Sequence, residues 1–359
     1  MKIIHTADLH LESKMGVNFD KETAKKRRNE LLFTFENLIL EAKKSDVKVI
    51  IIAGDMFDTK SVNKKTKEYI LNLFKNNSDI DFIYTSGNHD EDNFFFDSVD
   101  LPKNFKSFSD DWQTYEYDDV SITGINYNDK TSKILYDTLN LDKERKNIVV
   151  LHGQVSQYKA PGCINLNQLI DKGIDYLALG HIHSLKFDKL DDRGVWVYPG
   201  CLEPRGFDEI GDKGYVLIDT DTIKKPEFVK FSLRTCHDLE VDVTGINEWM
   251  EISNKIIDYL SQFPNEDLIH LTLVGKYDIS LIKRIEVLED RLKQLFFAVR
   301  IKDESKLAIN IEEYKNEISL KSEFIQTVIN EQELDEDTKQ IVLDLGIKAL
   351  LGDDVYETF

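Results

Sequence analysis

The chain has 359 residues, of which 41% are hydrophobic and 31% are charged, a composition that supports a folded core and excludes disordered, collagen-like and coiled-coil proteins. The longest aliphatic run, Val49–Ala53, is far shorter than the roughly 20 residues of a membrane-spanning helix, so no membrane association is predicted. Asp8 interrupts any signal-peptide core, and three cysteines without pairing logic indicate a reduced, cytoplasmic protein.

The net charge of −20 is unevenly distributed along the chain. Residues 1–235 hold 33 Lys and Arg against 39 Asp and Glu, a net −6, whereas residues 236–359 hold 13 against 27, a net −14. Nucleic-acid affinity depends largely on cationic contacts with phosphates, so this chain is a poor autonomous binder of polyanions. If its substrate is a nucleic acid, metal ions, local basic patches or a partner must offset the charge.

Short β-branched runs alternate with longer amphipathic stretches over residues 1–235. Seven segments are predicted as strands: Lys2–Ala7, Lys48–Ala53, Asp81–Thr85, Ser121–Ile125, Ile148–His152, Tyr176–Leu179 and Tyr215–Asp219. Apolar residues at helical spacing predict a helix over Lys21–Lys44, and residues 62–76 and 164–172 are also predicted as helices. This alternation predicts an α/β domain with helices on the sheet faces.

A second, smaller α/β module is predicted over residues 236–318. Its expected strands are Leu239–Val243, Leu268–Val274 and Phe297–Ile301, with helices near 246–262 and 278–296. Two further helical patterns, starting near Leu320 and Ile341, predict a C-terminal helical tail over residues 319–359. The apolar stripes of this tail must be buried either on the chain's own domain or on a partner.

Asp, Asn and His residues follow predicted strands at five points: Asp8-Leu9-His10, Gly54-Asp55, Gly87-Asn88-His89-Asp90, His152 and Gly180-His181-Ile182-His183. Open α/β sheets place their ligand sites just beyond the carboxyl ends of strands. Carboxylate oxygens combined with imidazole nitrogens suit Mn, Fe or Zn in a two-metal hydrolytic site. The preceding glycines are expected to permit sharp turns that direct the next side chain toward a shared point.

These five motifs and their order resemble the calcineurin-like metallophosphoesterase superfamily over roughly residues 1–235. The resemblance narrows to the Mre11/SbcD nuclease branch, and most of all to bacterial YhaO-type SbcD-like exonuclease subunits, through the segments Ile51–Asp58, Gly87–Asp90, His152–Gln154, Ala178–His183, Tyr198-Pro199-Gly200, Arg205–Glu209 and Lys213-Gly214. One departure is Cys201, where these proteins often have serine. The resemblance implies a four-layer α/β/β/α sandwich, a smaller α/β capping domain and a helical tail.

The resemblance also implies a role for eight side chains. Two divalent cations are expected, Mn²⁺ first among them and Fe, Zn or Mg as alternatives. The first cation would be held by Asp8, His10, Asp55 and His183; Asp55 would bridge to the second, which Asn88, His152 and His181 complete. A carboxylate can bridge two cations because it offers two oxygens with several lone pairs. His89 would be the catalytic acid or phosphate-orienting group.

Other features keep two interpretations open. The basic clusters Lys25–Arg28 and Lys64–Lys67 fit either contacts with a phosphate backbone or solvated helix faces. Phe94–Phe96 fit either a homodimer interface, as helices of this region form in the resembled family, or the chain's own core. His5 lies within a predicted strand and is expected to be a hydrogen-bonded core residue.

Three functions follow from these observations. The leading hypothesis is a metal-dependent DNA phosphodiesterase, the exonuclease subunit of a DNA repair complex whose Rad50/SbcC-like coiled-coil ABC ATPase binds the helical tail. The second is a metallophosphoesterase that acts on a small nucleotide or a phosphomonoester. The third is a non-catalytic scaffold, which the seven converging metal-binding groups argue against, because a scaffold has no physical need for them.

Overall fold

The structure is a computed structural model that describes residues 1–16, 19–58, 62–90, 101–128, 130–158, 163–278, 281–308 and 318–351, without the side chains of residues 336, 337, 340, 344, 348 and 351. Phe94–Phe96, the candidate dimer contact, lie outside the described residues. The chain divides into two compact units, Met1–Cys236 and His237–Phe359.

The first unit contains two six-stranded sheets. One has the order β14 (Glu227–Lys230), β13 (Gly214–Asp219), β1 (Lys2–Thr6), β2 (Val47–Ala53), β3 (Asp81–Thr85) and β4 (Phe105–Ser107). The other has the order β11 (Lys186–Lys189), β12 (Val195–Tyr198), β10 (Tyr176–Gly180), β7 (Lys146–His152), β6 (Val120–Gly124) and β5 (Gln113–Tyr117). Strands β1 to β4 run parallel, as do β12, β10, β7 and β6.

The two sheets pack face to face across a dry apolar layer. Alternate residues of the first sheet, such as Val49 and Ile51, meet Ile148, Val150 and Ala178 of the second sheet in this layer. The residues between them in sequence are buried as well, because both sheets are also covered on their outer faces. This double burial explains why several strands are apolar throughout.

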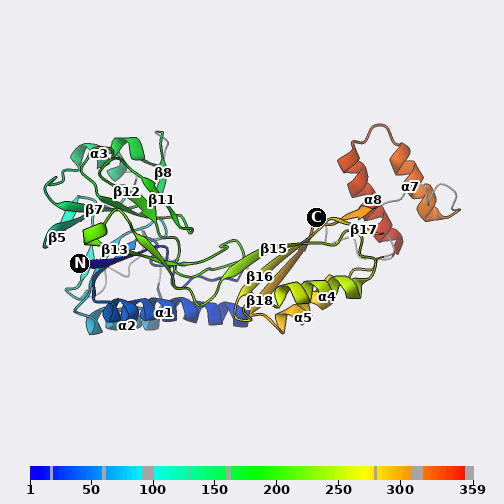
Figure 1. The fold of residues 1–359 in the computed structure, drawn as a ribbon, viewed down its shortest axis with the longest axis horizontal. Coiled ribbons are helices and arrows are strands. Elements are labelled where there is room, and N and C mark those ends of the chain that lie inside the picture. The colour runs from blue at the N-terminus through cyan, green and yellow to red at the C-terminus, as the bar shows by residue number, and fades with distance from the viewer. Residues whose placement is uncertain are drawn as a thin grey trace. The chain divides into compact units, whose positions relative to one another are not determined.

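Helices cover the two outer faces. Helices α1 (Lys21–Lys44) and α2 (Lys64–Asn76) lie along the first sheet (Figure 1), and the Asp20 side chain caps α1 by accepting from two backbone N–H groups. The short helical segments α3 (Leu135–Thr138) and η2 (Leu166–Gln168) contribute Leu135 and Leu166 to the apolar layer on the second sheet, and the single turn η1 (Thr131–Lys133) precedes α3. The unit is therefore a four-layer α/β/β/α sandwich, which confirms the fold that the resemblance implied.

All seven strands predicted for this unit are present, with ends within two residues of the expected ones. The helix predicted over residues 164–172 is wrong. Asn165 is extended and pairs with Ser156, which joins β9 (Cys163–Asn165) to β8 (Gln154–Ser156). Its side chain then caps only the single turn η2, and Asp171, with φ of 59°, ends any helical continuation.

The second unit contains a three-stranded sheet of β15 (Cys236–Asp242), β16 (Leu268–Val274) and β18 (Ala298–Asp303), and a small ladder of β17 (Lys276–Asp278) and β19 (Lys306–Ala308). Helices α4 (Trp249–Leu260) and α5 (Ile285–Lys293) pack on the larger sheet (Figure 1). Helix α5 is shorter than predicted, since Asp278 belongs to β17 and residues 281–284 are not helical.

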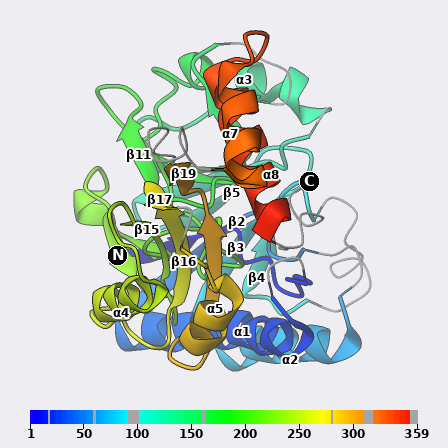
Figure 2. The same cartoon turned by 90° about the vertical axis from the view of Figure 1, so that its right-hand side faces the viewer.

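The tail forms helices α7 (Leu320–Asn330) and α8 (Glu336–Leu351), which pack side by side (Figures 1 and 2). One face of this pair, with Ile325 and Leu343, belongs to the apolar core of the second unit. Leu320 and Ile341 point outward and are 70% and 59% exposed. The tail therefore buries part of its apolar surface on its own unit and leaves at least one large apolar side chain exposed on each helix. In the described part of the chain, no helix is long and apolar enough to cross a membrane.

Candidate metal centre

All eight residues that the sequence singled out lie together in the first unit. Asp8 and His10 follow β1, Asp55 follows β2, Asn88 and His89 follow β3, His152 ends β7, and His181 and His183 follow β10. Since these strands are parallel within their sheets and the sheets are stacked, their carboxyl ends meet at one edge of the sandwich. The contacts described below link every member of the set.

Close packing at this edge, both between the two sheets and between neighbouring strand ends of the first sheet, requires glycine. A β-carbon on Gly180 would lie 1.8 Å from the Ala53 carbonyl oxygen, and one on Gly87 would lie 2.1 Å from an Asp55 carboxylate oxygen. Of the three glycines that precede site residues, only Gly54 has the positive φ, 87°, of the sharp turn expected from the sequence. At the other two positions glycine supplies space and not a turn.

Four of the candidate ligands have unusual backbone conformations. The φ angles of Asp8, His10, Asp55 and His181 are 52°, 44°, 49° and 110°. Each such residue costs on the order of 1–3 kcal/mol and persists only where the surrounding structure enforces it. The concentration of strained residues at one edge indicates that these side chains are positioned for function and not for the stability of the fold.

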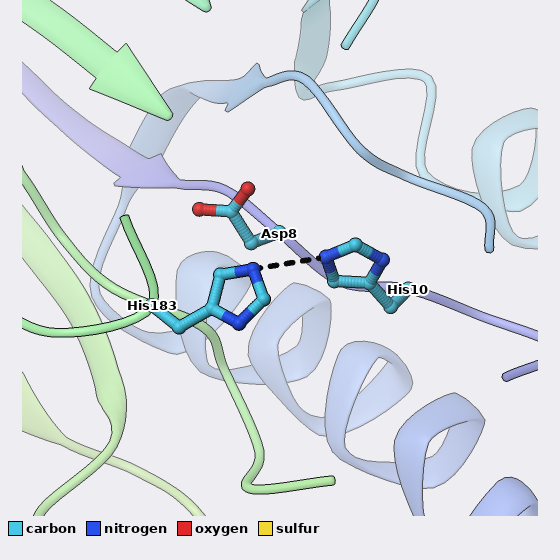
Figure 3. A group of neighbouring side chains, drawn as sticks. All are labelled: Asp8, His10 and His183. Carbon is cyan, nitrogen blue, oxygen red and sulfur yellow. Dashed lines mark hydrogen bonds between the residues drawn. The ribbon is translucent and has the colours of Figure 1, made fainter. Parts of the chain in front are cut away.

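Asp8, His10 and His183 form a cluster whose ligand atoms all lie within 4.8 Å of one another (Figure 3). The Nε2 atoms of His10 and His183 face each other at 3.2 Å. The far nitrogen of each ring meets a carboxylate: His10 Nδ1 lies 3.0 Å from Asp58 Oδ1, and His183 Nδ1 lies 2.6 Å from Glu209 Oε1. A carboxylate can only accept, so both Nδ1 atoms carry protons.

This tautomer assignment tests whether a cation fits. When both rings are neutral, as cation binding requires, the protonated Nδ1 atoms leave the two Nε2 lone pairs directed at each other, beside the Asp8 carboxylate. Two lone pairs at 3.2 Å repel unless a proton or a cation lies between them. Metal-bound histidines characteristically donate their second N–H to a carboxylate, as both rings do here. The donor set fits a divalent cation.

A second set of donors lies on the other side of Asp55. Asp8, Asp55 and His152 form another cluster of possible ligand atoms within 4.8 Å. His152 Nδ1 donates a hydrogen bond to the Ala53 carbonyl at 2.9 Å. This leaves Nε2 unprotonated and able to bind a cation, 3.5 Å from Asp55 Oδ2. The same Asp55 oxygen lies 3.8 Å from His10 Nε2, so this carboxylate stands between the two histidine groups.

Asn88 completes the second set. Its Oδ1 lies 3.0 Å from His152 Nε2 and 3.1 Å from His181 Nδ1. An amide oxygen and two imidazoles from three different strand ends thus surround one point. The two clusters of possible ligand atoms have Asp8 in common, and Asp55 Oδ2 lies 3.8 and 3.5 Å from a histidine nitrogen of each group. The assignment of the seven side chains to two cations, with Asp55 as the bridge, stays a prediction.

Burial shifts the pKa values of the histidine and the carboxylate ligands in opposite directions. It lowers the pKa of His152 to about 4 and also lowers the pKa of His10, so both rings are neutral at pH 7. Burial, opposed by the charge of His183 and reinforced by that of Asp55, raises the pKa of Asp8 to about 7. Two carboxylates crowded in a dry site disfavour ionisation, and a cation placed between them would remove that penalty.

His89 differs from the ligands in its exposure, since its side chain is 45% accessible. Its ring packs edge-on against His10, with centroids 5.1 Å apart, and its Nδ1 lies 3.5 Å from Asp58 Oδ1. Its backbone N–H donates to Asp55 Oδ1 at 2.9 Å. The ring is therefore held beside the centre with its outer edge open to solvent.

Three residues that surround the ligands, Asp58, Glu209 and Arg205, have no role predicted from the sequence. Asp58 and Glu209 bind the far nitrogens of His10 and His183, and Arg205 contacts both carboxylates. All three occur in the segments that carry the family resemblance. A carboxylate three residues after Asp55 was a usable signal, whereas the role of Arg205 depends on distances between loops that the sequence does not specify.

Other expectations are settled by burial. His5 is fully buried and its Nδ1 lies 2.9 Å from the Tyr176 hydroxyl, which confirms it as a hydrogen-bonded core residue. Arg27 is also fully buried, paired with Glu203 at 2.8 Å and with Glu30. Arg27 is thus a structural residue, and the phosphate-contact interpretation of its basic cluster is wrong for this member.

A two-sheet α/β sandwich with carboxylates and imidazoles at its strand ends is typical of metal-dependent hydrolases. The sequence profile of the family described as Calcineurin-like phosphoesterase matches residues 1–185, and the chain belongs to this family.

Two relatives and one solved structure illustrate the similarity. The chain is 27% identical over 285 residues to the uncharacterized metallophosphoesterase YhaO of Bacillus subtilis (strain 168), covering 73% of this chain and 68% of YhaO. It is 25% identical over 321 residues to the DNA double-strand break repair protein Mre11 of Sulfolobus acidocaldarius, covering 81% of this chain and 80% of that protein. The crystal structure of TT1561 of Thermus thermophilus aligns at 14% identity with a TM-score of 0.44, covering 64% of this chain and 98% of TT1561.

Proposed function

We propose that this protein is a DNA phosphodiesterase that uses two divalent cations, with Mn²⁺ as the expected ion. The observation that carries the proposal is the position of Asp55, whose Oδ2 lies 3.8 Å from His10 Nε2 on one side and 3.5 Å from His152 Nε2 on the other. A single carboxylate between two imidazole groups is the arrangement needed to join two cations.

The chain's own residues divide into two donor sets under this proposal. The first cation would be held by Asp8, His10, Asp55 and His183, and the second by Asp55, Asn88, His152 and His181. When bound, such a pair polarises a phosphoryl oxygen and supplies a strong nucleophile at neutral pH. The carboxylates and amide oxygen provide the negative charge and hard oxygen atoms that Mn²⁺ accepts alongside imidazole.

His89 is proposed as the general acid. Its exposure allows it to reach a substrate, and Asp58 near Nδ1 leaves Nε2 as the ring atom that can give a proton to the leaving oxygen. The backbone hydrogen bond from His89 to Asp55 fixes the distance between this ring and the centre. A residue with this exposure and this tether can act on substrate without binding the cations.

DNA is proposed as the substrate because the similarity to the double-strand break repair protein Mre11 covers 81% of the chain, well beyond the 185 residues matched by the family profile. Lys25, Lys26, Lys64 and Lys65 are exposed on the first unit and could contact phosphates. Arg27 is excluded from such contacts by its burial.

The test compares three substrates with the protein as purified and reloaded with Mn²⁺. A DNA duplex labelled at its 3′ end should be cleaved, a cyclic dinucleotide and p-nitrophenyl phosphate should be cleaved slowly or not at all, and Asp55→Asn should be inactive. Preferential hydrolysis of either small substrate would replace DNA with a small phosphate ester. Failure to hydrolyse any of the three by a protein that binds Mn²⁺ would favour the scaffold.

We further propose that the exposed apolar side chains of the tail, Leu320 on α7 and Ile341 on α8, bind a coiled-coil ABC ATPase. These side chains remain accessible although the opposite face of the helix pair is buried in the core of the second unit. Helices that present apolar anchors at regular spacing are a common partner-recognition element. Such a partner could also supply the basic surface that this acidic chain lacks.

A further inference from the structure

Arg205 stands behind the first donor set without being one of its ligands. Its guanidinium binds Glu209 through Nε and Nη2, at 3.1 and 3.0 Å from Oε1, and reaches Asp58 through Nη1, at 3.2 Å from Oδ1. Its own backbone N–H also donates to Glu209 Oε2 at 2.6 Å. The side chain is 21% exposed, so the charge is held largely inside the protein.

The two carboxylates that Arg205 joins are those that bind the far nitrogens of His10 and His183. Asp58 comes from the segment after β2, whereas Arg205 and Glu209 come from the segment after β12. One guanidinium therefore connects the supports of two ligand histidines that follow strands in different sheets. The rigid planar fork of arginine can hold two carboxylates at once, which the single ammonium of lysine cannot do with the same geometry.

In the part of the chain that the structure describes, no guanidinium links residues of the second donor set in this way. His152 is oriented by the Ala53 carbonyl, and His181 contacts the Asn88 amide. A change at position 205 should therefore affect the first set and leave the second nearly intact.

We infer that Arg205 is a positioning residue for the first cation. By holding Asp58 and Glu209 in place, it keeps the Nδ1 protons of His10 and His183 engaged and directs both Nε2 atoms to one point. Loss of such outer support weakens metal binding by roughly 10- to 100-fold in proteins. This inference rests on the two-cation centre proposed above.

The experiment counts bound Mn²⁺ from the loss of the EPR signal of the free ion, using full-length protein. Wild type should bind two ions, and Arg205→Met should bind the first at least about 10-fold more weakly while the second is unchanged. In an Asn88→Ala background, which cripples the second set, Arg205→Met should abolish the single remaining high-affinity ion. Arg205→Lys retains the charge and should restore part of the affinity.

Arg193→Met is the matched control. Arg193 holds Asp175 by a similar two-pronged pair, with Nε and Nη2 at 3.1 and 2.9 Å, but Asp175 directly precedes β10 and so lies at the opposite end of that strand from His181. This variant should bind both ions with wild-type affinity.

Unchanged binding of both ions by folded Arg205→Met would overturn the inference, and so would an equal loss at the two sites. If Arg205→Met does not fold, Arg205→Lys decides: a weakened first ion supports the inference and wild-type affinity overturns it. Wild-type protein that binds no Mn²⁺ would instead refute the two-cation centre itself.

Discussion

Asp55 is the residue on which the two halves of the metal centre depend. Its carboxylate lies within 4 Å of an imidazole nitrogen from each donor set, at 3.8 Å from His10 and 3.5 Å from His152. Asp55→Ala is therefore expected to lose both cations together, because neither set keeps its shared ligand and the remaining charge falls by one. Asn88→Ala, which removes a ligand of one set, is expected to lose one cation only.

Elemental analysis after dialysis against Mn²⁺ measures both variants beside wild type. Retention of one ion by Asp55→Ala would show that the carboxylate belongs to a single site. Uptake of one ion by wild type at saturation would show that the centre is mononuclear.

A second prediction for a single residue concerns His89. Replacing it with Asn should leave the Mn²⁺ content near wild type, since the ring is a neighbour of His10 and not one of the seven ligands. The rate of DNA cleavage should fall by roughly 10²-fold or more, as expected for loss of a general acid. The loss should be much smaller for a p-nitrophenyl phosphodiester, whose leaving group needs no proton.

Single-turnover cleavage rates on the two substrates, normalised to metal content, provide the measurement. A variant that loses a cation would place His89 among the ligands. An equal loss of rate on both substrates would indicate that the ring orients phosphate and does not donate a proton.

At the scale of elements, His5 links the two sheets of the sandwich. It lies on β1, and its Nδ1 meets the hydroxyl of Tyr176 on β10 at 2.9 Å. Burial lowers the pKa of His5 to about 3. Because the unfolded chain has the ordinary value near 6.5, it binds a proton between these values that the folded chain does not, and stability is lost as the pH falls below about 6.5.

His5→Gln should remove this dependence while keeping a polar partner for Tyr176. Between pH 7.5 and 5.5 the wild type should lose about 1.4 kcal/mol more unfolding free energy than the variant, by proton linkage. Urea unfolding at the two pH values, with a chelator present in both, provides the measurement. Equal losses would show that the imidazole is protonated in the folded state.

The strands of the first unit that the sequence predicted share one property, which is nearly continuous burial. Strands β1, β2 and β3 have nearly every side chain buried, so their apolar runs stand out in the sequence. Strands β5 and β11 lie at the two edges of the second sheet and expose most of their residues, and no apolar pattern marks them. An edge strand is held by backbone hydrogen bonds to one neighbour, which leave no signature in residue type.

The residues of the candidate site also differ in whether the sequence could identify them. The ligands could be placed because each follows a strong strand, and strand ends gather ligands in this class of sheet. Asp58 carried a usable signal because it follows Asp55 by three residues. The pairing of Glu209 with His183 and of Arg205 with Asp58 could not be predicted, because these partners lie 26 and 147 residues apart in the chain. Distances between loops are set by how the sheets stack and not by local sequence.

For the whole molecule, the partly buried tail determines how partner binding should be tested. Truncation after Ile318 would remove Ile325, Val328, Leu343 and Ile347 from the core of the second unit and is expected to destabilise that unit. Ile341→Asp changes only an exposed side chain and should abolish co-purification with the proposed ATPase partner while leaving the melting temperature near wild type.

Val287→Asp is the matched control, since this residue of α5 is an equally apolar side chain with 62% exposure, close to the 59% of Ile341. It should co-purify normally. Full recovery of the ATPase with Ile341→Asp would place the interface elsewhere, whereas loss with both variants would indicate a general effect of added charge on this acidic unit.

The Ala53 carbonyl oxygen is constrained by two neighbours, the His152 ring and the backbone of Gly180. His152 Nδ1 donates to it at 2.9 Å, and a β-carbon at position 180 would lie 1.8 Å from it. A single methyl group there would have to displace the acceptor that orients a ligand imidazole or spread the sheets that carry the two halves of the centre. The spacing between the two donor sets is then governed by a position that has no side chain, so exchanging ligand side chains cannot adjust it independently of how the sheets stack.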